Sequence, residues 1–219
     1  GDRSPTCGSG SEHDMSTTDL VRCPTCPTIF LYEAPQAVPM VEGTTWSDGF
    51  CDVRPYRLEE LAPVHRCARC NRWHWIDDLR RLFAVSLSTE SIPRVDAMTP
   101  LAAEDLVEAI AQGWPPRREQ KLRTQLLLLQ NHPRRVDPQS ETITAEIMEN
   151  LERLSDIVDN GADALFAAEI HRELGDFPRA RALIPAATHI SPHRAAAISA
   201  RLESRSIAPF PLLRDEARC

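Results

Sequence analysis

The pattern of hydrophobic and polar positions changes near residue 100. Between residues 20 and 85, short alternating runs are separated by prolines and turn residues, which favours short strands joined by long loops. The best strand candidates are residues 28–34, TIFLYEA, and residues 72–77, RWHWID. From about residue 100 the chain is rich in Leu, Ala, Arg and Glu and carries helix start and stop signals. The pattern therefore predicts an α+β protein, with a small β-rich part followed by a helical array.

Helices are predicted throughout the second part, each bounded by capping residues, glycine or proline. For the first helix, Thr99 is the expected cap, Pro100 suits the first turn and Gly113 ends it. The second helix is expected to end before Pro133, and Pro185 should kink or shorten the fifth. The predicted helices cover residues 99–113, 118–132, 140–160, 162–174, 176–187 and 191–204.

Two Cys-x-x-Cys pairs are the strongest chemical signal in the sequence. Cys23 and Cys26 form the first pair, and Cys67 and Cys70 form the second. A tight turn directs both sulfurs of a pair at one ion, and two pairs supply the four thiolates of a tetrahedral zinc site. Such a closed shell leaves no position for water, so the predicted Zn²⁺ is structural, with iron as the main alternative metal. Two unrelated pairs of reduced cysteines remain the other interpretation.

The two pairs resemble the knuckles of a zinc ribbon, in which each cysteine pair lies at the turn of a hairpin. The resemblance covers roughly residues 20–80 and implies a rubredoxin-like four-Cys module. Ribbons often place glycine after each second cysteine, where this chain has Pro27 and Asn71. Asn tolerates a positive φ and Pro does not, so the first knuckle must turn differently. Cys51, His65 and His74 stay open as substitute ligands.

The second cysteine pair is surrounded by basic and aromatic residues. In a strand, Trp73 and Trp75 would share one face, and Arg72 and His74 the other. This surface could bind nucleic acid through phosphate contacts and base stacking, or a protein through its Trp and Arg side chains. Alternatively, both tryptophans pack inward and the arginines are solvated. The candidate partner-binding residues are Arg66, Arg69, Arg72, Trp73 and Trp75.

Residues 160–195 carry small residues, a glycine turn and a closing proline at repeat-like spacing. Ala168 and Ala180 would let two helices approach closely, and Gly175 permits the turn between them. This stretch resembles a tetratricopeptide repeat, a helix–turn–helix unit of about 34 residues, which implies scaffolding and protein binding. A plain helical bundle stays an alternative. The positions laid on the repeat pattern are Ala164, Ala167, Ala168, His171, Gly175, Asp176, Ala180, Ile184 and Pro192.

Charge and composition narrow the function further. The formal net charge is −7, so any nucleic-acid contact would need a local basic patch. Apolar runs stay far below the roughly 20 residues of a membrane span, and no signal peptide is visible, which favours the cytoplasm and no membrane partner. Gly-rich phosphate loops, G-x-S-x-G and H-E-x-x-H motifs are absent from the sequence, which predicts a protein that is not an enzyme.

The combined interpretation is a zinc-binding adaptor or scaffold that mediates protein–protein interaction. A nucleic-acid-associated factor that uses the second knuckle is the alternative. The ribbon joined to repeat-like helices also resembles bacterial proteins of unassigned function, so no activity is carried over. The predicted segments are a disordered leader over 1–19, a zinc ribbon over 20–85, a linker over 86–99, helices over 100–206 and a tail over 207–219.

Overall fold

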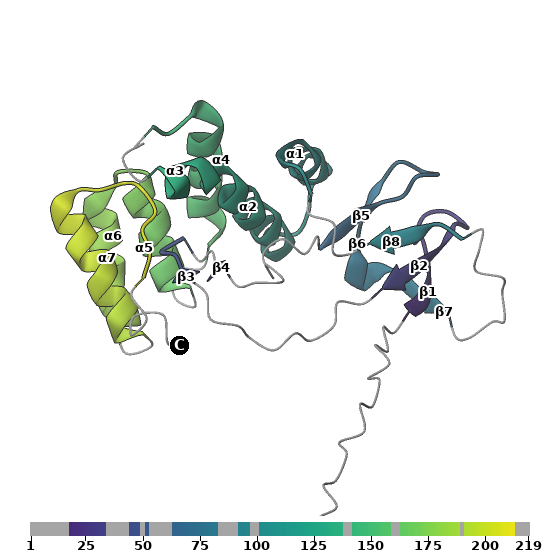
Figure 1. Ribbon diagram of the computed structural model, residues 1–219, viewed down its shortest axis with the longest axis horizontal. Helices are drawn as coiled ribbons and strands as arrows, with labels where there is room; N and C mark the ends of the chain where they lie inside the picture. Colours follow the sequence, from purple (N-terminus) through teal and green to yellow (C-terminus); the bar gives the residue numbers. More distant parts are fainter. Residues whose placement is uncertain are drawn as a thin grey trace, which may run out of the picture.

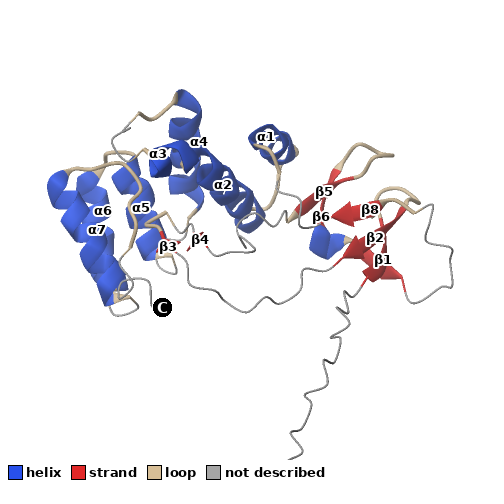
Figure 2. Ribbon diagram, in the orientation of Figure 1, coloured by secondary structure: helices blue, strands red, loops and turns tan. Residues whose placement is uncertain are grey.

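The protein combines small β-sheets with a larger helical part, as a computed structural model shows (Figures 1 and 2). This confirms the predicted α+β class. Helices α1 and α2 lie between the β-rich part and the remaining helices (Figure 1). The residues that the structure describes are 18–33, 44–48, 51–52, 63–82, 92–96, 101–137, 142–158, 163–188 and 191–212.

The largest sheet has the strand order β7-β1-β2-β8. Strands β1 (Thr18–Arg22) and β2 (Ile29–Glu33) form an antiparallel hairpin. Strand β7 (Arg80–Leu82) pairs antiparallel with β1, and β8 (Arg94–Asp96) pairs parallel with β2. The first cysteine pair therefore lies at the turn of the β1–β2 hairpin.

Two smaller antiparallel pairs complete the β structure. Strands β5 (Val64–Arg66) and β6 (Trp73–Trp75) form a hairpin with the second cysteine pair at its turn. Strands β3 (Thr44–Thr45) and β4 (Cys51–Asp52) form the other pair, within the insert between the two cysteine pairs. A 3-10 turn, Ile76–Asp78, follows β6.

The boundaries of the β-rich part differ from the segment boundaries predicted from the sequence. The predicted linker, 86–99, contains β8, and the predicted leader, 1–19, contains the start of β1. Neither strand was predicted from sequence. Strand β8 pairs in parallel with a strand about sixty residues earlier, which local patterns do not reveal.

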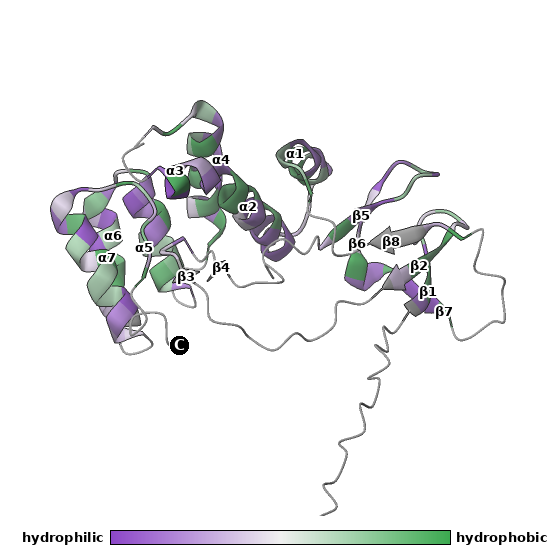
Figure 3. Cartoon of the chain, viewed as in Figure 1, coloured by the Kyte–Doolittle hydropathy of each residue, from purple (hydrophilic) through white to green (hydrophobic). Residues whose placement is uncertain are grey.

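Seven described helices follow, and each carries both hydrophobic and hydrophilic residues (Figure 3). All six predicted helices are present. The short α3, which follows the end of α2 at Gln130, was not predicted. The helices are α1 (Ala103–Ala111), α2 (Pro116–Gln130), α3 (His132–Val136), α4 (Ala145–Ile157), α5 (Ala164–Glu173), α6 (Phe177–Ala187) and α7 (Pro192–Ser204).

Two details of the helix predictions need correction. Helix α1 starts at Ala103, because the Asp105 side chain accepts a hydrogen bond from the Ala102 amide and closes the first turn there. The predicted cap, Thr99, lies outside the described residues. Helix α6 continues to Ala187 although Pro185 lies within it. Pro185 falls in the last turn, so the helix continues for only two residues beyond the position at which proline removes a backbone hydrogen bond.

A hydrophobic core joins the β5–β6 hairpin to α1 and α2. The indole rings of Trp73 and Trp75 pack with Leu106 of α1 and with Leu122 and Leu126 of α2. All five side chains are buried. Burying a large apolar side chain is worth about 1.5–3 kcal/mol, so this contact holds the hairpin against the helices.

The end of the described chain also belongs to the core. Phe210 and Leu212 pack with Ala168, Ile198 and Leu202 of the α5, α6 and α7 helical cluster. Residues 207–212 were predicted to be part of a tail because they show no periodicity. These residues are buried by helices that lie far away in the sequence, and the pattern of a short irregular segment does not predict such contacts.

The insert between the cysteine pairs reaches the helical part. We call residues 44–48 and 51–52 the strap. Trp46 forms a β-bridge with Pro211, and the Ser47 amide donates to the Phe210 carbonyl at 2.9 Å. Arg194 of α7 donates to the Ser47 carbonyl at 2.8 Å. Residues 44–48 were assigned to the ribbon segment by sequence, yet they pack on the helices (Figure 1).

A buried ionic cluster anchors the strap. Each of its three carboxylates forms an ion pair with a guanidinium, so each buried charge has a partner of opposite sign. Asn131 connects two of these pairs, since its Nδ2 donates to Asp48 at 3.1 Å and to Glu173 at 3.1 Å. All six charged side chains are at most 6% exposed. The ion pairs are Asp48 with Arg135, Glu173 with Arg134, and Glu169 with Arg172.

Replacing Asp48 with alanine tests the anchoring of the strap. The change leaves Arg135 buried without this carboxylate, and breaking a buried pair in this way costs about 3–5 kcal/mol. Asp19→Ala is the matched control, because its ion pair with Arg81 is exposed and worth about 0–1 kcal/mol. Urea unfolding at neutral pH measures both values, and equal losses in the two variants would contradict the anchoring role.

Glu173 gives the cluster a pH dependence. Burial, followed by the charge of Glu169, raises the pKa of Glu173 to about 7. The folded state thus holds this proton more tightly than the unfolded chain, where a glutamate titrates near about 4.3. Its stabilisation is complete at low pH and is lost as the pH rises through about 7. We expect the stability of wild type relative to Glu173→Gln to fall between about pH 5 and about pH 8 in urea unfolding. Parallel pH curves would contradict this.

Candidate metal centre

Both cysteine knuckles are closed by the same backbone hydrogen bond. The Cys23 amide donates to the Thr28 carbonyl at 2.9 Å, and the Cys67 amide donates to the Arg72 carbonyl at 2.9 Å. We call residues 23–28 the first knuckle and residues 67–72 the second knuckle. The equal spacing explains how two unrelated hairpins present their cysteines in the same way.

The second knuckle turns at Asn71, which has a φ of 57°. Its amide donates to the Cys67 carbonyl at 2.8 Å. Asparagine adopts this left-handed conformation more readily than most residues, so the predicted turn chemistry is confirmed here. Proline at position 27 cannot reach a positive φ and has no amide hydrogen to donate, so the first knuckle keeps the bond between the Cys23 amide and the Thr28 carbonyl but cannot make the counterpart of the Asn71 bond.

The four cysteine sulfurs form one cluster. The Sγ atoms of Cys23, Cys26, Cys67 and Cys70 all lie within 4.8 Å of one another. Cys26 and Cys67 are 3.6 Å apart, and Cys23 and Cys70 are 3.8 Å apart. A tetrahedron with metal–sulfur bonds of about 2.3 Å has sulfur–sulfur edges of about 3.8 Å. The donor set and its spacing therefore fit a four-coordinate metal ion such as Zn²⁺.

His74 and Thr25 lie beside one edge of this cluster. The Nε2 atom of His74 is 3.3 Å from the Cys23 sulfur and 3.6 Å from the Cys70 sulfur. The Thr25 hydroxyl is 3.2 Å from the Cys70 sulfur. At these distances both groups act as hydrogen-bonding neighbours of the sulfurs. Side chains beside metal ligands orient those ligands and tune their basicity. The sequence suggested His74 as a substitute ligand and did not predict this supporting role.

The other two substitute ligands considered from sequence lie elsewhere. His65 stacks edge-on against Phe30, with ring centroids 4.9 Å apart. Cys51 belongs to β4, whose backbone pairs with Thr45 of the strap. Among the described residues, the candidate metal ligands are therefore the cysteines of the two Cys-x-x-Cys pairs.

Three of the thiols have shifted pKa values. Burial raises the pKa of Cys67 to about 11. Hydrogen bonding to His74, and then to Thr25, lowers the pKa of Cys70 to about 5. The hydrogen bonds to Thr28 lower the pKa of Cys26. Because the thiolate is the metal-binding form, Cys70 is ready to bind near neutral pH, whereas Cys67 must release its proton as the metal binds.

Trp73 and Trp75 are not available as a docking surface. Their side chains are 4% and 3% exposed and lie in the core between the hairpin and the helices. The Trp75 ring also meets Trp114 edge-on, at 5.7 Å, and carries the Arg118 guanidinium over its face at 5.0 Å. The inward-packing alternative is therefore the one that the structure supports for both tryptophans.

The three candidate arginines separate into two groups. Arg66 forms an ion pair with Glu108 of α1 at 2.8 Å and lies over the Trp73 ring at 5.8 Å. It thus helps to hold the hairpin on the helices. Arg69 and Arg72 are exposed on the second knuckle. Among the sequence-predicted partner-binding residues, these two remain accessible.

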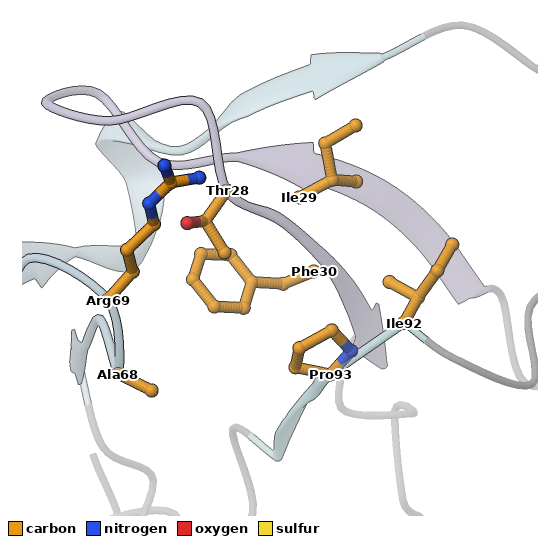
Figure 4. Close-up of a pocket in the computed structure, with 7 residues that line it drawn as sticks. All are labelled: Thr28, Ile29, Phe30, Ala68, Arg69, Ile92 and Pro93. Carbon is orange, nitrogen blue, oxygen red and sulfur yellow. The ribbon is translucent and has the colours of Figure 1, made fainter.

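An open groove beside the knuckles was not predicted from sequence. It has a volume of about 510 Å³ (Figure 4). Two of its residues, Ile92 and Pro93, lie in the segment that was predicted to be a linker. We call it the knuckle groove, and its lining residues are Thr28, Ile29, Phe30, Ala68, Arg69, Ile92 and Pro93.

Four clustered cysteines at two hairpin turns fit a metal site of the zinc-ribbon kind. No protein-family model matches the chain, and neither characterised proteins nor solved structures give a significant match. None of the helices in the described part of the chain is both long and apolar enough to cross a membrane. The class of the site therefore rests on its own geometry.

Removing one thiolate tests the metal centre. We expect Cys67→Ser to weaken metal binding by more than about 100-fold, because even outer-shell changes cost about 10–100-fold. Cys51→Ser is the matched control and should keep wild-type affinity, since Cys51 lies in the strap. Titration with Co²⁺, read by its thiolate charge-transfer absorption, gives stoichiometry and affinity. Unchanged binding by Cys67→Ser would contradict the four-cysteine assignment.

Proposed function

We propose that the protein is a non-enzymatic cytoplasmic adaptor that binds another protein and uses a structural metal ion, Zn²⁺ in preference to iron. The observation that carries this proposal is the four-sulfur cluster, which offers four protein ligands and so leaves no place on a tetrahedral ion for a substrate. Such an ion stabilises a surface. It does not perform a reaction.

The carboxylate pair with the most enzyme-like spacing also has a structural role. Glu169 and Glu173 lie one helical turn apart on α5 and are 1% and 0% exposed. Each is bound to an arginine, Glu169 to Arg172 and Glu173 to Arg134, at 2.6 Å. Both carboxylates are buried and paired with arginines inside the helical part, which favours a structural role and supports an adaptor over an enzyme.

The α5–α6 hairpin supports protein binding. Gly175 has a φ of 77° between the two helices, and the Asp176 side chain accepts a hydrogen bond from the Arg179 amide at the start of α6. Ala168 and Ala180 are both fully buried, which allows close helix packing. This arrangement agrees with the tetratricopeptide-like interpretation, and repeats of that class present surfaces to other proteins.

A nucleic-acid-associated factor is the second candidate. The exposed Arg69 and Arg72 on the second knuckle favour it, because arginines contact phosphates. However, both tryptophans of that hairpin are buried, so neither can stack on a base. The affinity for nucleic acid would then have to come from phosphate contacts alone, although the chain carries a net charge of −7.

A pull-down followed by reconstitution tests the adaptor role. We expect the zinc-loaded full chain to retain a protein partner after nuclease treatment, and the purified pair to associate directly in titration calorimetry. A protein contact of ordinary polarity should depend weakly on salt, whereas nucleic acid loses affinity steeply, with a slope of about −0.9 per phosphate contact. Metal-stripped protein is the control, and it should bind more weakly. Direct binding of nucleic acid without any protein partner would contradict the proposal.

A further inference from the structure

The knuckle groove lies where three segments meet. Thr28 ends the first knuckle, and Ile29 and Phe30 begin β2. Ala68 and Arg69 come from the second knuckle, and Ile92 and Pro93 from the residues before β8. Figure 4 shows the Arg69 guanidinium at one end, near Thr28, and Ile92 and Pro93 toward the other. The groove therefore offers one charged end and one apolar end.

The apolar part of the groove is firmly built. Phe30 is 1% exposed, and its ring is held by the edge-on contact with His65. The Pro93 carbonyl accepts a hydrogen bond from the Leu31 amide at 2.9 Å, which fixes the opposite wall. Ile29 and Ile92 are half-buried, whereas Pro93 is exposed. Aliphatic surface thus stays in contact with water in an open depression.

Among the described residues, no acidic side chain pairs with the charged end of the groove. Arg69 is exposed and forms no ion pair with any residue that the structure describes, and the same holds for its neighbour Arg72. The chain as a whole carries a net charge of −7, so these cations are locally distinct. A guanidinium binds a carboxylate through two parallel hydrogen bonds, which makes an acidic group the complementary ligand.

We propose that the knuckle groove binds a short acidic segment of a partner protein. An apolar side chain of that segment packs against Phe30, Ile92 and Pro93, and a neighbouring carboxylate pairs with Arg69. The inference rests on the proposed adaptor function and specifies the chemistry of the partner. Burial of the apolar side chain supplies most of the affinity, and the ion pair selects for acidic sequences.

The lining favours a peptide over nucleic acid. Its exposed and half-buried apolar residues are aliphatic, and its one aromatic ring, Phe30, forms the buried floor. Single-stranded nucleic acid is usually recognised by stacking bases on accessible aromatic or arginine planes, and of these the lining offers the Arg69 guanidinium alone. Instead, Ile29, Ile92 and Pro93 form an aliphatic surface against which an apolar side chain can pack.

The metal site holds two walls of this groove in place. Ala68 and Arg69 lie between the ligands Cys67 and Cys70, and Thr28 closes the first knuckle by accepting from the Cys23 amide. A bound ion fixes both knuckles relative to each other. Removal of the metal should therefore abolish peptide binding, which connects the structural ion to the adaptor role.

Selection from a peptide library tests the groove. The zinc-loaded full chain would be screened against random heptapeptides, and enriched peptides measured by fluorescence polarisation. We expect enrichment of sequences in which Asp or Glu neighbours an aliphatic residue. Arg69→Glu should weaken their binding by about tenfold or more, and peptides with Lys in place of the acid should recover affinity for that variant. Arg72→Glu, on the same knuckle but outside the groove, should change binding by less than about twofold.

Several outcomes would overturn the inference. They are a lack of enriched peptides, equal binding by wild type and Arg69→Glu, and tighter binding of an oligonucleotide probe that Arg69→Glu abolishes. Co²⁺ titration of Arg69→Glu verifies that its metal site, and hence its fold, is intact. If a purified partner protein binds the Arg69→Glu variant as it binds wild type, the groove is not the docking site and the adaptor function stands. If neither partner nor peptide binds, both proposals fail.

Discussion

The four-sulfur cluster is the constraint on which the β-rich part depends. The β1–β2 and β5–β6 hairpins belong to different sheets, and the described apolar core around them is small. Two of its five buried members, Cys23 and Cys67, are themselves proposed metal ligands. A module of this size rarely buries enough apolar surface to be stable alone, whereas structural Zn²⁺ contributes an apparent binding energy of about 10–16 kcal/mol. A metal ion bound by the four cysteines would therefore be the main connection between the two hairpins.

The same cluster also constrains the path of the insert between the two cysteine pairs. The chain leaves the sulfur cluster at Cys26, passes through the strap on the helical part, and returns to the cluster at Cys67. Closing this loop costs conformational entropy on folding, and the ion pair of Asp48 with Arg135 fixes the strap within the loop. The sulfur cluster thus holds the two ends of the segment, and the buried ionic cluster holds its middle. Between them, Trp73 and Trp75 fasten the second hairpin to α1 and α2.

Local chemistry explains what could be predicted from the sequence. The cysteine spacing, the turn at Asn71 and the helix limits near Gly113 and Gly175 all depend on neighbouring residues, and the structure has these features. Non-local pairing explains what could not. Strand β8 needs a parallel partner far away in the chain, and its sequence alone resembled a linker.

Burial direction was the second limit of sequence reasoning. Alternation showed that Trp73 and Trp75 share a face, but not that α1 and α2 would cover it. Arg134 and Arg135 appear polar in any sequence pattern, and they are buried only because Glu173 and Asp48 arrive from other segments to neutralise them. The knuckle groove combines both limits, since it joins residues of three segments that have no common sequence signal.

The second hairpin therefore has two distinct structural roles along its length. In its strands, Trp73 and Trp75 are buried against α1 and α2, and Arg66 pairs with Glu108 of α1. In its turn, Arg69 is exposed and lines the knuckle groove. A ligand at the turn would not compete with the packing that holds the hairpin on the helices. Docking at the groove would thus be compatible with an intact core, because the cysteines of the turn and the side chains that pack on the helices lie at different ends of the hairpin.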